Sequence, residues 1–481
     1  MTIADDVAPL DATAQSELVR RGELTVVELV EGAVARIEAV NPGLNAVITP
    51  TFDRALAQVE HGVTGPFAGV PFLLKDLALE LEGVRFCEGS RFTRDHVSTY
   101  TSEVVQRMED AGLVILGKTN TPEFGMVPTT EPVRFGPTRN PWDPTRSTSG
   151  SSGGSAAAVA SRMVPMAHAD DLGGSIRYPA AACGLFGLKP SRGRISYAPE
   201  YGDVVSGWAS EFAVTRSVRD AAALLDALAG PSAGDPYAVP PPSRPFAHEA
   251  TTEPGRLRVG YTSRTADGSP GHPDCVAALD ATLAALAELG HEVIETSLPP
   301  FDEVTGNAIG TVFNAATAWI VGYWTRVLGR GPEPGELEPL TQCYWEMGRE
   351  VRAGDYLLAI EALQRLSRRI AASFGAYDVF VNPTMSEPPA PIGEITSTVD
   401  DPMRALERGG RTVAYSGVIA NFTGQPAMSV PAGESADGLP MGVHVLGRFG
   451  DEATLLRLGA QLERARPWAD RAPPVVAGPH A

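Results

Sequence analysis

Short apolar runs that alternate with an amphipathic helical pattern constrain the fold of this chain more than any other feature of its sequence. Residues 67–74 are apolar and bounded by Gly and Pro, which indicates a buried strand that ends at Lys75. A helical pattern over residues 103–111 leads to a second apolar run at residues 113–116. Because strands that alternate with helices are typical of layered architectures, we expect an α/β fold.

The 481-residue chain is expected to form a single domain over residues 1–481. Strand-like runs return late in the chain, which favours one sheet completed from both ends over two independent domains. The late runs are residues 378–381, 427–430 and 441–446. The patterns also predict an N-terminal helical region at 1–60, a core at 61–230 that holds the motifs described below, a Pro-rich surface connection at 231–256, and a helical, aromatic region at 300–375.

Composition argues against several classes of function. The chain has 58 acidic and 39 basic residues, a net charge of −19 and no basic stripe, so we expect no nucleic-acid partner. Its four cysteines and eight histidines are scattered, so we expect neither a disulfide framework nor a metal site. No apolar run approaches the roughly 18 residues of a membrane span. The acidic N-terminus lacks a signal-peptide pattern, and we therefore expect a cytoplasmic protein without membrane association.

Two Ser/Gly-rich segments, residues 150–155 and 171–177, follow the strand that ends at Lys75. Either segment alone is more often a flexible turn. Together with a lysine in apolar surroundings they favour nucleophilic catalysis, because a serine needs a base and a buried lysine is biased toward its neutral, basic form. The alternative interpretation of Lys75 is an ion pair with Asp76 or another acid.

Gly173 and Gly174 precede Ser175 in the second of these segments. Successive glycines allow backbone N–H groups to converge on one point without interference from side chains. Such a group of donors stabilises the negative charge that develops on a carbonyl oxygen during acyl transfer. The segment is therefore predicted to form an oxyanion hole, and the whole constellation predicts an amide hydrolase.

These segments closely resemble the motifs of the amidase signature family, and the resemblance covers most of the chain. It implies the amidase signature fold, in which a large mixed central β-sheet is covered by helices on both faces, and an enzyme with no metal or cofactor. A homodimer is common in that family. The matching positions are residues 69–76, 117–120, 123–124, 150–155, 421–427 and 438–442, together with Asp171, Gly174, Ser175, Arg177, Pro179, Gly184, Gly187, Lys189, Pro190 and Gly193.

The resemblance also implies a role for each site residue. Ser175 would be the nucleophile, Ser151 a bridging serine in a cis peptide, and Lys75 the general base. The chain departs from the family pattern at Ser149, where glycine is common, and at Asp170, where threonine or serine is usual. The remaining implied roles are the oxyanion hole, formed by the amides of Leu172, Gly173, Gly174 and Ser175, and the supports Ser152, Asp171 and Arg177.

Within the family, the chain is most similar to the bacterial 6-aminohexanoate cyclic-dimer hydrolase group. The similarity lies in residues 11–15, 41–47, 66–71 and 138–142. It predicts a nylon-oligomer-like amide, an aryl amide, a carbamate (urethane) or an ester as substrate, rather than a short primary amide.

Three residues are candidates for the substrate pocket. Residues 300–346 would form a lid that carries Asn314 and Trp319, and Met126 would line the acyl pocket. Aromatic and methionine side chains at such positions belong to an ordinary core at least as often. Two other functions remain open: an amidotransferase A-type subunit in transfer-RNA charging, and a non-catalytic scaffold that keeps the fold.

Overall fold

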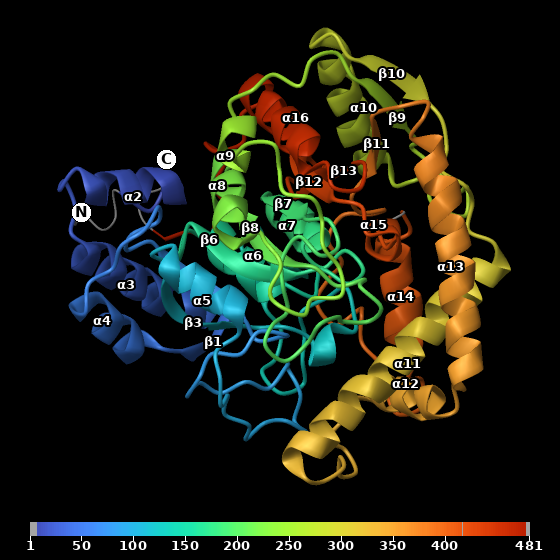
Figure 1. The fold of residues 1–481 in the computed structure, drawn as a ribbon, viewed down its shortest axis with the longest axis horizontal. Helices are drawn as coiled ribbons and strands as arrows, with labels where there is room; N and C mark the ends of the chain where they lie inside the picture. Colours follow the sequence, from blue (N-terminus) through green and yellow to red (C-terminus); the bar gives the residue numbers. More distant parts are fainter. Residues whose placement is uncertain (1–6, 416, 478–481) are drawn as a thin grey trace.

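The computed structural model describes residues 7–415 and 417–477 and has a mixed β-sheet at its centre (Figure 1). Eight strands follow one another in the order β10-β9-β11-β13-β12-β7-β8-β6. β9 runs parallel to β10 and β11, whereas all other neighbours are antiparallel. The predicted α/β class is confirmed. The strands are β6 (Met166–Asp170), β7 (Phe186–Lys189), β8 (Glu211–Thr215), β9 (Arg258–Tyr261), β10 (Glu292–Glu295), β11 (Val379–Pro383), β12 (Ala427–Glu434) and β13 (Pro440–Leu446).

A smaller sheet of β1 (Val47–Pro50), β3 (Val114–Thr119) and β2 (Pro71–Lys75) lies beside the large one, with β2 next to β6. β2 and β3 are the two apolar strands that the sequence predicts. β1 corrects the prediction of a wholly helical N-terminal region. Its β-branched residues favour an extended chain and pair with β3. The remainder of that region forms α2 (Ala12–Arg20), α3 (Val26–Leu44) and α4 (Phe52–Glu60).

Helices cover both faces of the large sheet. α8 (Val218–Leu228), α10 (Pro273–Glu288) and α16 (Glu452–Ala465) pack on one face, and α6 (Gly153–Ala160) and α7 (Arg177–Cys183) on the other. α7 approaches the sheet so closely that a Cβ at Gly187 would lie 2.7 Å from the Ala180 Cβ. A Cβ at Gly442 would lie 2.6 Å from the Ala181 Cβ. These two strand glycines therefore allow α7 to sit directly on the sheet.

The helical region at 300–375 consists of α11 (Glu303–Leu328), α12 (Pro339–Arg349) and α13 (Ala353–Ser373), drawn in yellow and orange in Figure 1. α11 packs against both of the others. The segment 231–256 includes α9 (Phe246–Glu249), which packs on α8 and α16. Over the residues that the structure describes, no helix is both long and apolar enough to cross a membrane. The remaining α-helices and strands are α5 (Glu103–Asp110), α14 (Arg404–Thr412), α15 (Ile419–Thr423), β4 (Arg139–Asn140) and β5 (Asp143–Ser147).

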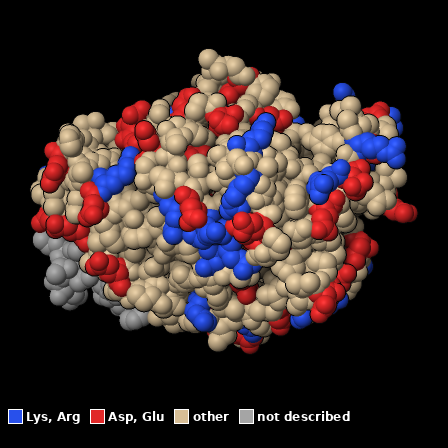
Figure 2. All heavy atoms as spheres, turned by 90° about the horizontal axis from the view of Figure 1, so that it is seen from below, with Lys and Arg blue, Asp and Glu red and all other residues tan. Residues whose placement is uncertain are grey.

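Charged side chains are unevenly distributed on the surface. On the face drawn in Figure 2, Lys and Arg side chains gather near the middle, and Asp and Glu side chains lie around them. Basic side chains are therefore concentrated near the middle of that face rather than spread evenly over it.

The close packing of α7 leads to a stability prediction. Gly187→Ala should lower the free energy of unfolding by about 1–3 kcal/mol, because the added methyl group overlaps Ala180 and Ile176. Denaturant unfolding followed by circular dichroism measures the change. Gly322→Ala on α11 is the control, since a Cβ there meets nothing within 4 Å and alanine favours a helix over glycine by up to about 1 kcal/mol. Equal stability of both variants would contradict the packing argument.

Candidate active site

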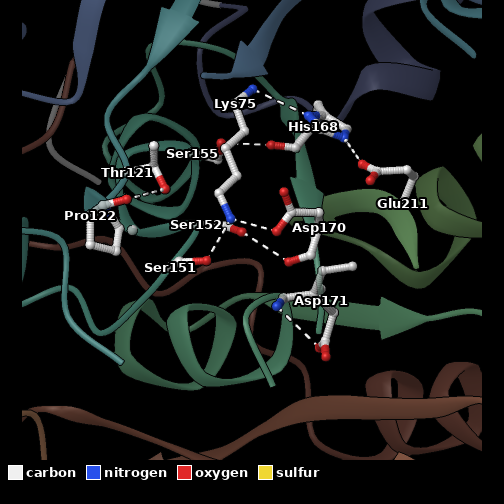
Figure 3. Close-up of polar contacts among 12 residues, drawn as sticks. Lys75, Thr121, Pro122, Ser151, Ser152, Ser155, His168, Asp170, Asp171 and Glu211 are labelled. Carbon is white, nitrogen blue, oxygen red and sulfur yellow. Dashed lines mark hydrogen bonds and ion pairs between the residues drawn. The ribbon is translucent and has the colours of Figure 1, made fainter. Parts of the chain in front are cut away.

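Lys75 lies at the end of β2 with a fully buried side chain. Its Nζ atom is 2.6 Å from Ser151 Oγ and also 2.6 Å from Asp170 Oδ1 (Figure 3). Its backbone N–H donates to Nδ1 of His168 on β6 at 3.2 Å. The structure therefore brings together both features that the sequence suggested for this lysine, a neighbouring serine and an acidic partner. That acid is Asp170 rather than Asp76.

Ser151 stands just before α6 and follows a cis peptide bond between Gly150 and Ser151. The chain is tightly packed here: a Cβ at Gly150 would lie only 2.4 Å from the carbonyl oxygen of Thr129. The preceding residue, Ser149, has a φ of 59° and donates its hydroxyl to the carbonyl oxygen of Pro128 at 3.2 Å. The serine that replaces the usual glycine is thus held by a neighbouring loop.

Ser175 occupies the turn between β6 and α7 and is half-buried. It lines the same cavity as Ser151 and Asp170. Its carbonyl oxygen accepts a hydrogen bond from the N–H of Ser152 at 3.3 Å. The Ser152 hydroxyl in turn donates to the carbonyl oxygen of Asp170 at 3.2 Å. Ser152 therefore connects the two serine-bearing turns, as a supporting residue would.

In the turn before Ser175, one of the four predicted oxyanion donors, the Gly174 amide, donates to a side chain of the turn itself. Gly174 has a φ of +127°, and its N–H donates to Asp171 Oδ1 at 2.8 Å. A Cβ at Gly174 would lie 2.0 Å from the Tyr178 ring, so only glycine fits. The Gly174 amide thus already has a carboxylate acceptor within the turn. The other three predicted donors are the amides of Leu172, Gly173 and Ser175, and the oxyanion hole stays a prediction.

A buried ion pair braces this turn. Arg177 donates from Nε to Asp171 Oδ2 at 2.9 Å and from Nη2 to Asp171 Oδ1 at 2.8 Å, and neither side chain is exposed. Burial alone would raise the pKa of Asp171, but the charge and hydrogen bonds of Arg177 hold it well below its usual value. Asn421 on α15 also donates to Asp171 Oδ1, at 2.9 Å. The sequence contained Asn421 in a family motif, but nothing in the pattern indicated this role.

Two cavities meet at Ser175. The first has an empty volume of about 800 Å³ and includes Ser151, and the second has about 880 Å³. Met126 lines both cavities, and Trp319 on α11 lines the first. Asn314 lies instead where α11 packs on α12, since a Cβ at Gly348 would be 2.0 Å from its carbonyl oxygen. Asn314 is not among the residues that line these two cavities, and a role for it in substrate binding stays a prediction. Phe313, Ala316, Thr317 and Ile320 are the neighbouring residues of α11 that line the first cavity.

Comparison with known proteins identifies the family. The Amidase family profile matches residues 28–456. The chain belongs to the amidase family. It is 40% identical to 6-aminohexanoate-cyclic-dimer hydrolase from Paenarthrobacter ureafaciens over 97% of both chains. It is also 39% identical to putative amidase AmiB2 from Mycobacterium tuberculosis, over 98% of this chain and 99% of that protein.

Solved structures agree with this assignment and confirm the predicted amidase signature fold. A 6-aminohexanoate cyclic dimer hydrolase complexed with substrate aligns with a TM-score of 0.92 at 38% identity, over 98% of this chain and 99% of that one. A bacterial aryl acylamidase of the amidase signature family aligns with a TM-score of 0.86 at 26% identity, over 97% and 98%. The chain is therefore an amidase, a hydrolase that acts on amide bonds.

In this amidase a neutral histidine connects β2, β6 and β8. Because His168 Nδ1 accepts the Lys75 N–H, its proton must lie on Nε2, which is 2.6 Å from Glu211 Oε2. Burial lowers the pKa of His168 to about 3 and raises the pKa of Glu211 to about 8. His168 is thus a fixed hydrogen-bonding group. Within the described residues, no group of three or more His, Cys, Asp or Glu side chains could hold a metal ion.

The Gly174 turn of this amidase provides a second prediction. Gly174→Ala should lower the free energy of unfolding by roughly 1–3 kcal/mol and reduce amide hydrolysis sharply, because the methyl group overlaps the Tyr178 ring. Thermal unfolding and turnover measure the two effects. Gly173→Ala is the matched control for stability, since a Cβ there has its nearest contact at 3.8 Å. A Gly174→Ala variant as stable as Gly173→Ala would contradict this account of the turn.

Proposed function

We propose that this amidase hydrolyses its substrate through Ser175 as nucleophile, Ser151 as proton relay and Lys75 as base. The observation that carries the proposal is the 2.6 Å contact between Lys75 Nζ and Ser151 Oγ inside a buried site. Ser151 and Ser175 line one cavity. A base at the end of such a relay can remove the proton that makes a serine hydroxyl a poor nucleophile.

The reaction follows as acyl transfer. Ser175 Oγ attacks the carbonyl carbon while its proton passes to Ser151 and the proton of Ser151 passes to Lys75. The amides of Leu172, Gly173 and Ser175 are the donors that would stabilise the oxyanion. When the C–N bond breaks, the same relay returns a proton to the leaving amine. Water activated by the relay then hydrolyses the acyl-enzyme and releases the acid.

The two cavities support a substrate that extends on both sides of the scissile bond. Each cavity is large enough for a chain of several carbon atoms or an aryl ring, and both open at Ser175. A short primary amide would leave one of them empty. Related proteins are named as a 6-aminohexanoate-cyclic-dimer hydrolase and an aryl acylamidase. We therefore propose linear or cyclic aminohexanoate-type amides and aryl amides as substrates, with carbamates and esters of similar shape.

The nucleophile is tested by Ser175→Ala, which should lower kcat on every accepted amide or ester by roughly 10³-fold or more, because no other group can replace the hydroxyl. The panel is the 6-aminohexanoate cyclic dimer, its linear dimer, an anilide, a carbamate and an ester, followed by product chromatography. Ser367→Ala on α13 is the control, since within the described part of the chain that hydroxyl donates only to the Leu363 carbonyl oxygen.

Retained turnover in Ser175→Ala would overturn the proposed nucleophile. The assay uses the isolated chain without transfer RNA, so activity on these simple amides also discriminates against an amidotransferase subunit. A chain that is inactive on the whole panel in its wild-type form would favour that alternative or a scaffold.

The second cavity is tested by Gly410→Leu on α14. A Cβ at Gly410 meets nothing within 4 Å and the residue lines this cavity, so the leucine should narrow it without a backbone clash. We expect kcat/KM for the cyclic dimer to fall by about tenfold or more, with less than a twofold change for propionamide. Gly306→Leu, on the exposed side of α11, is the control. Equal losses on both substrates would show that this cavity does not select substrates by size.

A further inference from the structure

Asp170, at the end of β6, is the residue of the site that departs most from an ordinary serine-lysine arrangement. Its Oδ1 atom lies 2.6 Å from Lys75 Nζ, on a side chain that is only 9% exposed. The same Nζ atom lies 2.6 Å from Ser151 Oγ. Lys75 is therefore held between a hydroxyl and a carboxyl group (Figure 3).

This contact limits how Lys75 can act as a base. A buried amine and a carboxyl group at 2.6 Å share one proton when the pair is neutral overall. While Lys75 carries that proton, it has no lone pair to offer to Ser151. It gains one only when the proton moves to Asp170. A working relay in this chain therefore needs a place for that proton on the carboxyl side.

Asp170 differs from the adjacent Asp171 in its ability to take a proton. Asp171 is surrounded by donors from Arg177, Asn421 and two backbone amides, which favour its ionised form. Asp170 Oδ2, by contrast, is buried without a hydrogen-bond partner among the described residues, and Asp170 lines the first cavity. Of two neighbouring carboxyl groups, one is held as an anion and the other is free to be protonated.

The charged and titratable groups around Asp170 come from four parts of the chain. They are Lys75 on β2, His168 on the same strand, Glu211 on β8, and Tyr197 in the segment before β8. Burial raises the pKa of Asp170 to about 6 although Lys75 opposes the shift. His168 is neutral, and burial raises the pKa of Glu211 to about 8. Asp170 is thus the member of this group that changes protonation just below neutral pH.

We propose that Asp170 is the terminal proton acceptor of the relay. As the Ser175 Oγ–C bond forms, Ser175 gives its proton to Ser151, Ser151 gives its own to Lys75, and Lys75 gives its ammonium proton to Asp170. When the C–N bond breaks, the leaving nitrogen takes a proton from Ser151, which regains one from Lys75, and Lys75 regains the proton that Asp170 held. The second half of the reaction repeats these transfers with water. This inference rests on the proposed function of Ser175, Ser151 and Lys75.

The proposal has a consequence for the pH dependence of turnover. The relay starts with Asp170 ionised, because a carboxyl group that already carries a proton cannot accept another. As the pH falls through about 6, Asp170 becomes protonated and the active fraction decreases. The wild-type enzyme should therefore show an acid limb in kcat/KM near pH 6, and variants without the carboxyl group should lack that limb.

The test compares Asp170→Asn, Asp170→Thr and Asp170→Glu with wild type on the best substrate of the panel, from pH 4.5 to 9. Asparagine and threonine keep a polar group beside Lys75 but cannot store its proton. We expect kcat to fall by about 10²-fold in both, with KM within about threefold of wild type and no acid limb near pH 6. Asp170→Glu keeps the carboxyl group and should recover part of kcat together with the acid limb.

Glu463→Gln on α16 is the matched control. Burial raises the pKa of Glu463 to about 7, so this residue changes protonation in the same range. Among the described residues, however, its carboxylate accepts only from the Val218 N–H on α8. The control variant should keep both kcat and the acid limb of wild type. Loss of the limb in Glu463→Gln would overturn the assignment of the limb to Asp170.

Two further results would overturn the proposal. One is a kcat within threefold of wild type in Asp170→Asn or Asp170→Thr with the acid limb unchanged. The other is a wild-type kcat/KM that stays flat from pH 8 to pH 5, which needs no variant and so remains decisive if a substitution prevents folding. Loss of activity in Ser175→Ala together with full activity in Asp170→Asn would refute this inference alone. Retained activity in Ser175→Ala would refute the proposed function on which it rests.

Discussion

The buried pair of Asp171 and Arg177 is the interaction on which the site depends. Two desolvated charges are favourable only when their hydrogen-bonding groups are fully used. Here the guanidinium also donates to Asn421 on α15 and contacts His444 on β13. The pair thus fixes the turn that carries Ser175 to parts of the chain that lie more than 200 residues later. The turn can therefore be rigid although it contains consecutive glycines.

The junction between the two sheets provides the other half of the site. β2 and β6 end side by side, so Lys75 and Asp170, the last residues of these strands, meet across the junction. His168 supplies the hydrogen bond that holds β2 at this point. A neutral imidazole suits this position, because it accepts from one strand and donates to the next without adding a buried charge. The fold thus brings the end of the small sheet to the turns of the large sheet.

The sequence predicted the parts of the site that have a local signature. Lys75 ends an apolar run, and the two serines lie in Ser/Gly segments, so each was identifiable without a structure. The partners that these residues find far along the chain were not identifiable from the sequence. Asp76 is adjacent to Lys75 in the sequence, but it lies just beyond the end of β2, and its carboxylate is 3.8 Å from Lys118 Nζ instead. The sequence also could not decide which residues of α11 face the cavities, since one step along a helix turns a side chain by about 100°.

The packing of α7 on glycine has a consequence for how this enzyme can diverge. The turn and α7 leave no space for an added methyl group at Gly174 or Gly187, so single substitutions at these two positions would disturb the packing. α11 contributes to the walls of both cavities and α14 to the wall of the second, and these helices belong to other regions of the chain. Substitutions in these helices can therefore change the shape of the cavities while the Gly174 turn and α7 stay unaltered. Variation for laboratory selection is therefore best directed at α11 and α14.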